Sequence, residues 1–259
     1  MKRFFYFILI LSVFIMIFPT KSFCQFYKVY GYDTPEAGEK EFSYWLSYIQ
    51  SSDHPHEFFG EEVEWEGLYA HSLEIEYGLS NRFAVALYLD FEHPRYSDIK
   101  WVNTKAVMAH YRFYEKKSRP VDMAICVDYK LPKKQYKDYE ELELKLILEK
   151  DFGFHTIVTN PTFGKKMSGR DIDKGIEFAF AGGYYYKRSP VVQPGIEFYS
   201  KMGEVRDTML FKEQESYVFP TVDIIFGKGA YKWNIGIGIG LTDPSDNIIF
   251  KSIISYGFF

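Results

Sequence analysis

Cysteine is nearly absent from this chain, which has 2 among its 259 residues. One of them, Cys24, falls at the end of an N-terminal segment that we expect to be removed. Cys126 would then be the only thiol of the mature chain. A single cysteine forms no intramolecular disulfide, so disulfides do not stabilise this protein.

Long apolar runs are absent too once the N-terminus is set aside. No run of about 18 apolar residues follows residue 24, which excludes helical membrane spans. The balance of 31 basic and 35 acidic residues is only slightly acidic, so nucleic acid is not an expected partner. Aromatic residues, by contrast, make up 20% of the chain, more than an average soluble domain contains.

The N-terminus has the layout of an export signal. A basic pair precedes an apolar run from Phe4 to Phe18, and Ser22 and Cys24 are the small residues expected before a cut. We therefore predict a secretory signal peptide over residues 1–24 and one mature domain over residues 25–259. A lipoprotein acylated at Cys24 is the less favoured alternative, because aliphatic and small residues do not precede this cysteine in the usual order.

The clearest pattern is an alternation between residues 62 and 91. In EVEWEGLYAHSLEIEYG, acidic Glu74 and Glu76 alternate with apolar Leu73 and Ile75, and RFAVALYLDF repeats the alternation. Successive side chains of a strand point to opposite faces, so each arm has one polar and one apolar face. About 9–11 tilted residues cross a bilayer core, a length both arms reach. This pattern is typical of a transmembrane β-barrel.

The whole chain predicts a closed sheet. The expected strands lie near residues 39–50, 62–78, 82–91, 98–114, 121–131, 139–150, 154–164, 172–187, 191–202, 217–227, 231–241 and 247–259. Short connections follow the even-numbered strands and mostly longer, polar ones follow the odd-numbered strands, as in outer-membrane barrels. The predicted fold class is all-β: a single antiparallel up-and-down transmembrane β-barrel of about 12 strands. Residues 25–38 are expected to form a short periplasmic lead.

The chain ends on Phe258 and Phe259. An open sheet edge in lipid leaves unpaired backbone groups, so the last strand must pair with the first. This ending resembles outer-membrane proteins generally, whose terminal strand commonly finishes on Phe and serves as an assembly signal. The resemblance implies export to the bacterial outer membrane, with outer-membrane lipid and the barrel-assembly machinery as partners.

A second resemblance covers most of the mature chain. The stretch LEIEYGLSNRFAVALYLDF, followed by PGIEFYS and the terminal YGFF, is similar to the small outer-membrane barrels of the phenol-degradation meta-pathway family of transporters. The shared pattern is an acidic strand, a Gly-Leu-Ser/Thr turn and a returning apolar strand. The resemblance implies a transport or channel role and no catalytic residues.

In the predicted strands, polar residues mostly occupy every second position. We assign these positions to the barrel interior, which gives a set of lumen-lining candidates. They are Glu64, Glu66, Glu74, Glu76, Arg82, Asp90, Asp128, Glu141, Glu143, Lys145, Glu177, Glu197, Asp223, Lys232, Gly236, Gly238 and Lys251. Acids outnumber bases, so an open pore should favour cations. The alternative is that these charges pair across strands and fill the interior. The glycines indicate barrel curvature or, less favoured, a smooth wall facing a solute or an inward-folded loop.

Other chemistry finds little support. His54 and His56 share a predicted loop with Asp53 and Glu57, but a metal site needs three or four converging ligands, so no metal is expected. No G-x-S-x-G motif accompanies any histidine in a predicted strand, so we expect no enzymatic activity. No sequence motif indicates a cofactor.

The sequence thus predicts a passive channel or transporter for small polar or cationic solutes. The alternative is a closed barrel scaffold whose extracellular loops bind a partner or a surface ligand. Residues 203–216 form the best candidate for either an inward plug or such a contact, because exposed apolar side chains often pack against something. The side chains concerned are Arg206, Met209, Leu210, Phe211 and Lys212.

Overall fold

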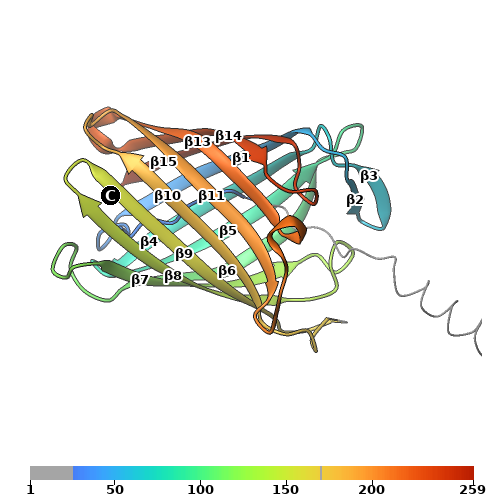
Figure 1. The fold of residues 1–259 in the computed structure, drawn as a ribbon. Coiled ribbons are helices and arrows are strands. Elements are labelled where there is room, and N and C mark those ends of the chain that lie inside the picture. Colours follow the sequence, from blue (N-terminus) through green and yellow to red (C-terminus); the bar gives the residue numbers. More distant parts are fainter. Residues whose placement is uncertain (1–25, 170) are drawn as a thin grey trace, which may run out of the picture.

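The structure is a computed structural model that describes residues 26–169 and 171–259. The predicted signal peptide lies outside the described residues. A thirteen-stranded antiparallel sheet dominates the fold (Figure 1). Setting aside β12 (Asp207–Thr208), which lies in a connection, the wall consists of β1 (Lys40–Ser51), β4 (Tyr69–Ser80), β5 (Phe83–His93), β6 (Lys100–Arg112), β7 (Asp122–Pro132), β8 (Glu141–Phe152), β9 (His155–Lys166), β10 (Glu177–Tyr186), β11 (Val192–Glu204), β13 (Glu215–Phe226), β14 (Tyr231–Gly240) and β15 (Ile248–Phe258).

These twelve strands close into a barrel. Each pairs with its neighbours along the chain, β1 pairs with β15 from Lys40 opposite Phe258 onward, and β10 pairs with β11. The predicted all-β, up-and-down barrel is therefore confirmed, including the pairing of the last strand with the first. Closure leaves no unpaired sheet edge along the wall.

The two ends of the barrel differ. At the turn end, where β1 begins and β15 finishes, β4 and β5 are joined through Asn81 and Arg82. At the loop end, the connection between β1 and β4 carries a small hairpin of β2 (Pro55–Phe58) and β3 (Glu61–Glu64). The remaining elements are two short 3-10 helices, η1 (Phe211–Glu213) and η2 (Gly227–Gly229). Among the described residues, no helix is long and apolar enough to cross a membrane.

The prediction of one strand over residues 62–78 is wrong in its first part. The barrel strand starts at Tyr69, and residues 61–64 belong to the separate hairpin. Gly67 explains the break, because its φ of +82° belongs to the left-handed region and interrupts an extended chain. Trp65 is accordingly buried at the loop end and does not face outward.

The faces of the wall follow the alternation. In β4, Glu74 is 1% and Glu76 7% exposed, whereas Leu73 is 36% and Ile75 47% exposed. Carboxylates therefore point into the barrel and apolar side chains point out of it. This pattern, polar inside and apolar outside, is the reverse of that in a soluble protein and suits a wall surrounded by hydrocarbon.

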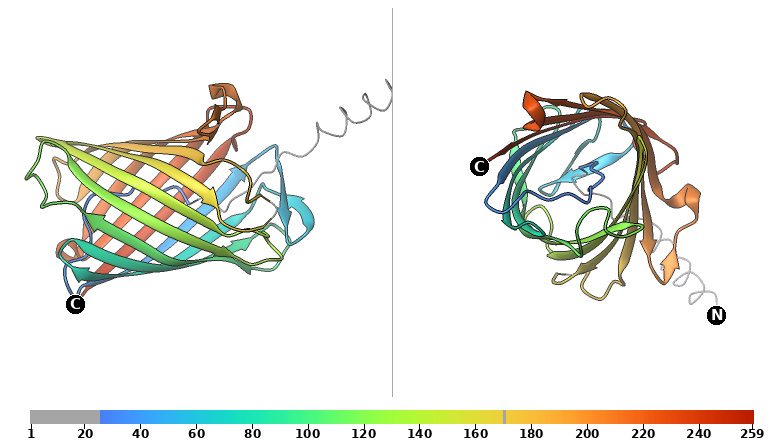
Figure 2. Two further views of the ribbon diagram at one scale, coloured as in Figure 1. Left: turned by 90° about the horizontal axis from the view of Figure 1, so that it is seen from below. Right: turned by 90° about the vertical axis from the view of Figure 1, so that its left-hand side faces the viewer.

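Residues 26–32 of the N-terminal segment occupy the interior, so the prediction of a periplasmic lead is wrong for this part of it. Residues 26–32 run inside the ring of strands, shown in dark blue in Figure 2, and residues 33–38 lead to the start of β1 at the turn end. Tyr27, Tyr30 and Tyr32 are all buried there. An aromatic segment gains free energy by leaving water, and the barrel interior supplies a site where its rings pack.

Gly238 and Gly236 make room for interior side chains. A Cβ on Gly238 would lie 2.2 Å from the Phe219 ring, and one on Gly236 would lie 2.9 Å from Cε of Lys251. The Phe219 ring packs in turn on Tyr27. The glycines of β14 therefore leave room for side chains that pack around an inward-folded segment. The sequence alone favours barrel curvature over this role.

A test follows for Gly238. We expect Gly238→Ala to destabilise the barrel by about 1–3 kcal/mol, because the added methyl overpacks the Phe219 ring. Gly257→Ala is a matched control, since its Cβ would meet only the flexible side chain of Glu39, with Oε1 at 2.9 Å. Urea unfolding in lipid vesicles measures both. Equal midpoints for the two variants would contradict the packing role of Gly238.

Candidate functional site

The candidate site is the interior groove that holds residues 26–32. Lys28 reaches β4, where its Nζ lies 3.3 Å from Oε2 of Glu74. The same oxygen accepts a hydrogen bond from Nε1 of Trp45 at 3.0 Å, and the Tyr88 hydroxyl donates to Oε1 of Glu74. Nζ of Lys28 also lies 4.4 Å from the centroid of the Trp45 ring, within cation–π range. Glu74 and Trp45 thus form an ammonium site inside the barrel.

Side chains of the wall bind the main chain of this segment. Oδ1 of Asn160 accepts from the Tyr30 N–H at 2.7 Å, and Nδ2 of Asn160 donates to the Tyr30 carbonyl at 3.0 Å. Oε2 of Glu149 accepts from the Tyr32 N–H at 2.9 Å. Because β8 and β9 supply these groups, the wall satisfies the polar backbone of a buried extended chain.

Aromatic side chains make a further slot. The Tyr27 ring lies 4.7 Å from Phe219, 5.2 Å from Tyr217 and 5.3 Å from Tyr199, measured between ring centroids. The Tyr217 and Tyr199 contacts are edge-on, a favourable geometry for rings. Lys251 Nζ donates to the Tyr27 carbonyl at 3.2 Å.

The segment is fastened at the turn end. Gly38 N–H donates to the Gly78 carbonyl at 2.8 Å, and Gly78 N–H donates to the Glu39 carbonyl at 3.0 Å. A Cβ on Gly78 would lie 1.9 Å from the Glu36 carbonyl oxygen, so only glycine allows the chain to pass this close. Two backbone hydrogen bonds therefore join the chain around Gly38 to β4.

Carboxylates gather around Lys28. Glu41 of β1 is directly opposite Glu76 of β4, on the parity that faces the interior. Oε1 of Glu76 is buried and has no hydrogen-bond partner among the residues that the structure describes. The cation next to Glu74, Lys28, therefore comes from the N-terminal segment and not from a strand of the wall. Withdrawal of the segment would leave these carboxylates facing the lumen.

Elsewhere the wall pairs its own charges. The interior ion pairs are Lys130 with Glu141 and Glu143, Lys145 with Asp128, Lys166 with Glu177, Lys232 with Asp223, and Lys251 with Glu197. Asp90 accepts hydrogen bonds from Ser72 and Asn103. Most of the predicted lumen-lining residues thus come together as neighbouring partners on the inner face. Whether they line an aqueous path stays a prediction.

Three of the predicted lumen-lining residues lie elsewhere. Glu64 belongs to the β2–β3 hairpin and is exposed, and Glu66 follows it, 3.8 Å from Arg95. Arg82 lies in the turn between β4 and β5, where its Nε is 2.7 Å from Oε1 of Glu115. The break at Gly67 removes the first two from the wall, and β5 starts one residue too late to include Arg82.

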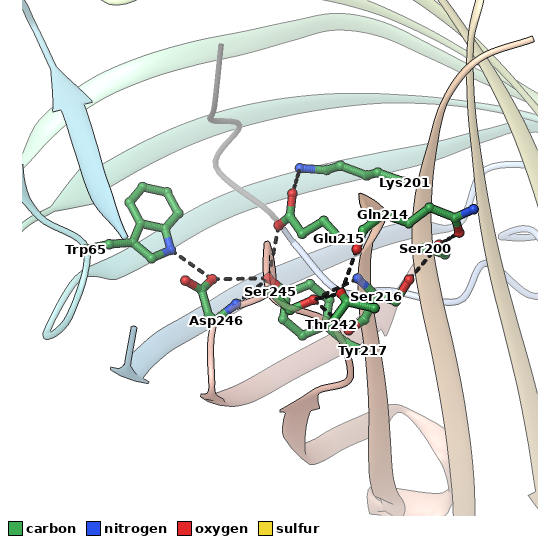
Figure 3. A network of polar contacts seen from close by, with 10 residues as sticks. All are labelled: Trp65, Ser200, Lys201, Gln214, Glu215, Ser216, Tyr217, Thr242, Ser245 and Asp246. Carbon is green, nitrogen blue, oxygen red and sulfur yellow. Dashed lines mark hydrogen bonds and ion pairs between the residues drawn. The ribbon is translucent and has the colours of Figure 1, made fainter. Parts of the chain in front are cut away.

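A network of hydrogen bonds fastens the first long connection to the rim at the loop end (Figure 3). Trp65 Nε1 donates to Oδ2 of Asp246 at 2.8 Å, and Ser52 donates to its Oδ1 at 2.6 Å. The Tyr217 hydroxyl accepts from the Asp246 N–H at 3.0 Å. Burial raises the pKa of Asp246, and the hydrogen bonds from Ser52 and Trp65 oppose that shift.

The β2–β3 hairpin is held on its other side by His56. Its Nε2 lies 2.9 Å from Oε2 of Glu92, and Tyr136 donates to Oε1 of Glu92 at 2.6 Å. His54 instead contacts the Asp243 carbonyl. The two histidines therefore diverge, and no group of three or more potential His, Cys, Asp or Glu ligands occurs within the described ranges.

The loop at 203–216 does not plug the barrel. Figure 2 shows this orange segment outside the ring of strands, and Met209, Leu210 and Phe211 are exposed. The inward plug is the N-terminal segment instead. The aromatic density of FYKVYGY at residues 26–32 is the sequence signal that indicates a buried position.

Solved structures of outer-membrane barrels share this architecture, as two of them show. The COG4313 outer membrane channel from Pseudomonas putida F1 has a TM-score of 0.64 at 11% identity, covering 88% of this chain and 98% of that chain. The KdgM porin has a TM-score of 0.55 at 12% identity, covering 85% and 99%. A further structure is of the KdgM porin in complex with disordered oligogalacturonate.

At such identities the likeness shows the fold alone: the chain has the β-barrel fold of outer-membrane channels and porins. No protein family and no curated protein matches the sequence. The resemblance to the phenol-degradation meta-pathway family therefore stays a prediction.

The interior ion pairs give a stability test. Lys251→Met would leave Glu197 buried without its cation, so we expect a loss of about 3–5 kcal/mol in unfolding free energy. Lys232→Met is the matched control, because the Lys232 side chain is 55% exposed and water can replace it beside Asp223. Urea denaturation compares them. A larger loss at Lys232 would contradict the burial of the Lys251 pair.

Proposed function

We propose that this chain is an outer-membrane channel for small polar or cationic solutes, closed at rest by residues 26–32. The observation that carries the proposal is the interior carboxylate cluster of Glu74 and Glu76, whose nearby cation Lys28 sits on a segment outside the sheet. Carboxylates lining a pore attract cations and repel anions. The names of the two similar structures, a channel and a porin, support a transport role.

The proposal includes the location. The apolar outer face, and the strand that ends at Phe258, suit insertion into the outer membrane by the barrel-assembly machinery. We expect fractionation to recover the mature protein in the outer membrane, extractable by detergent and not by salt. Recovery as a soluble periplasmic protein would contradict the proposal. No catalytic role is proposed for any residue.

Ion selectivity tests the solute class. Reversal potentials under a salt gradient should show cation preference in a variant that lacks residues 26–32. Neutralising the cluster with Glu74→Gln and Glu76→Gln should reduce that preference, and raised salt should weaken it as the screening length falls to about 10 Å at 0.1 M. Anion preference would mean that the wall lysines dominate the constriction, contrary to the proposal.

A closed scaffold with a binding loop is the second candidate. The exposed Met209, Leu210 and Phe211 favour it, since apolar side chains on a loop commonly mark a contact surface. The two candidates differ in conductance. A scaffold would stay silent in a planar bilayer with or without residues 26–32, whereas a channel would conduct once the segment is removed.

A further inference from the structure

We propose that the groove around residues 26–32 is a binding site for an extended peptide that carries aromatic side chains and a lysine. The N-terminal segment is its tethered occupant. This inference deepens the proposed function and rests on it in one respect: the ligand reaches the groove through the lumen.

The main-chain contacts point to a peptide. Asn160 binds the N–H and the carbonyl of one residue, Tyr30, as a neighbouring strand would. Two residues further along, Glu149 accepts from the N–H of Tyr32, and Lys251 donates to the carbonyl of Tyr27. A metal cation or a simple amine offers no such spaced donors and acceptors. Recognition of an extended backbone with pockets for particular side chains is a recurrent mode of peptide binding.

The side-chain contacts define the composition of the ligand. The slot formed by Tyr199, Tyr217 and Phe219 takes an aromatic ring. One residue further along, Glu74 and Trp45 take an ammonium group through an ion pair and a cation–π contact. An aromatic residue followed by lysine therefore fits the groove.

The tethered segment is a replaceable occupant. Within the described chain, no backbone-to-backbone hydrogen bond joins residues 26–32 to the wall, and the first such bond is made by Gly38. Side chains of the wall therefore hold the segment without extending the sheet. In addition, the buried Oε1 of Glu76 points to a donor that the segment does not supply. A free ligand with one more donor group would satisfy it.

The experiment uses a variant lacking residues 26–32, which keeps the anchor between Gly38 and Gly78. A synthetic peptide of residues 26–32 is titrated into this variant, by calorimetry in detergent and by block of current in a planar bilayer. The same peptide carrying Lys28→Glu is the matched control. We expect saturable binding of the native peptide and at least about tenfold weaker binding of the control, because a like charge would face Glu74. Asn160→Ala in the wall should weaken binding of the native peptide.

The two readouts separate the two proposals. A variant that conducts without binding the peptide overturns the peptide site and leaves the channel standing. Binding without conductance supports the site and overturns the channel. Equal affinity for the native and Lys28→Glu peptides overturns the ammonium subsite and with it this inference. If the deletion does not fold, the full chain carrying Lys28→Glu takes its place, because charge repulsion from Glu74 frees the same groove.

Discussion

Replacing Lys28 by glutamate should open the barrel. The substitution turns the 3.3 Å contact between Nζ of Lys28 and Oε2 of Glu74 into a meeting of two carboxylates, with Glu76 close by on the same strand. Like charges brought together cost several kcal/mol where water is scarce, and each 1.4 kcal/mol is about a tenfold change in an equilibrium. We expect the population with the segment withdrawn to rise by about a hundredfold or more, seen as frequent openings in planar-bilayer recordings.

Lys28→Arg is the matched control for this prediction. It keeps the positive charge and the contact with the Trp45 ring, since guanidinium also binds aromatic faces. Its openings should stay close to those of the unaltered chain. Equally frequent openings of the Lys28→Glu and Lys28→Arg variants would show that the ion pair with Glu74 does not hold the segment in place.

A charge on the outer face should destabilise the barrel strongly. Leu73 lies midway along β4 on the exposed parity, so Leu73→Arg would place a guanidinium in hydrocarbon. We expect a loss of about 2–4 kcal/mol in unfolding free energy in lipid vesicles. Glu74→Gln, one residue along and inside the barrel, should cost less, because the amide oxygen can still accept from Trp45 and the partly exposed Lys28 side chain keeps contact with water.

Leu73→Met serves as the control for substitution at that position, since it keeps an apolar side chain of similar volume. Its stability should be close to that of the unaltered chain. A loss at Glu74→Gln as large as that at Leu73→Arg would mean that the two faces of β4 are not polar and apolar environments.

The wall of the barrel could be predicted from the sequence because period-two alternation is a local signal. In β4, Glu74 and Ile75 differ in burial as the alternation requires, and the pairing of β15 with β1 follows from closure. The error at residues 62–68 was also local. Gly67 has a positive φ, and its presence in the acidic run is the signal that the barrel strand begins later.

The site was harder to predict because it depends on contacts between residues that are far apart in the sequence. Lys28 and Glu74 are 46 residues apart, and Tyr30 and Asn160 are 130 apart. Alternation assigns a residue to a face of a strand, but it does not place a segment that belongs to no strand. The pairing of interior charges, given as the alternative to an open lumen, needed only neighbouring strands, as Lys145 and Asp128 illustrate.

A paired planar-bilayer recording tests most directly whether residues 26–32 close an otherwise conducting barrel. The intact mature chain and the variant lacking these residues are inserted under the same salt and voltage. We predict at least about tenfold more current through the shortened chain. The deletion removes the aromatic side chains and the backbone of residues 26–32 from the lumen, while the strands of the wall stay paired. Equal current through the two proteins would contradict the role of the segment as a plug.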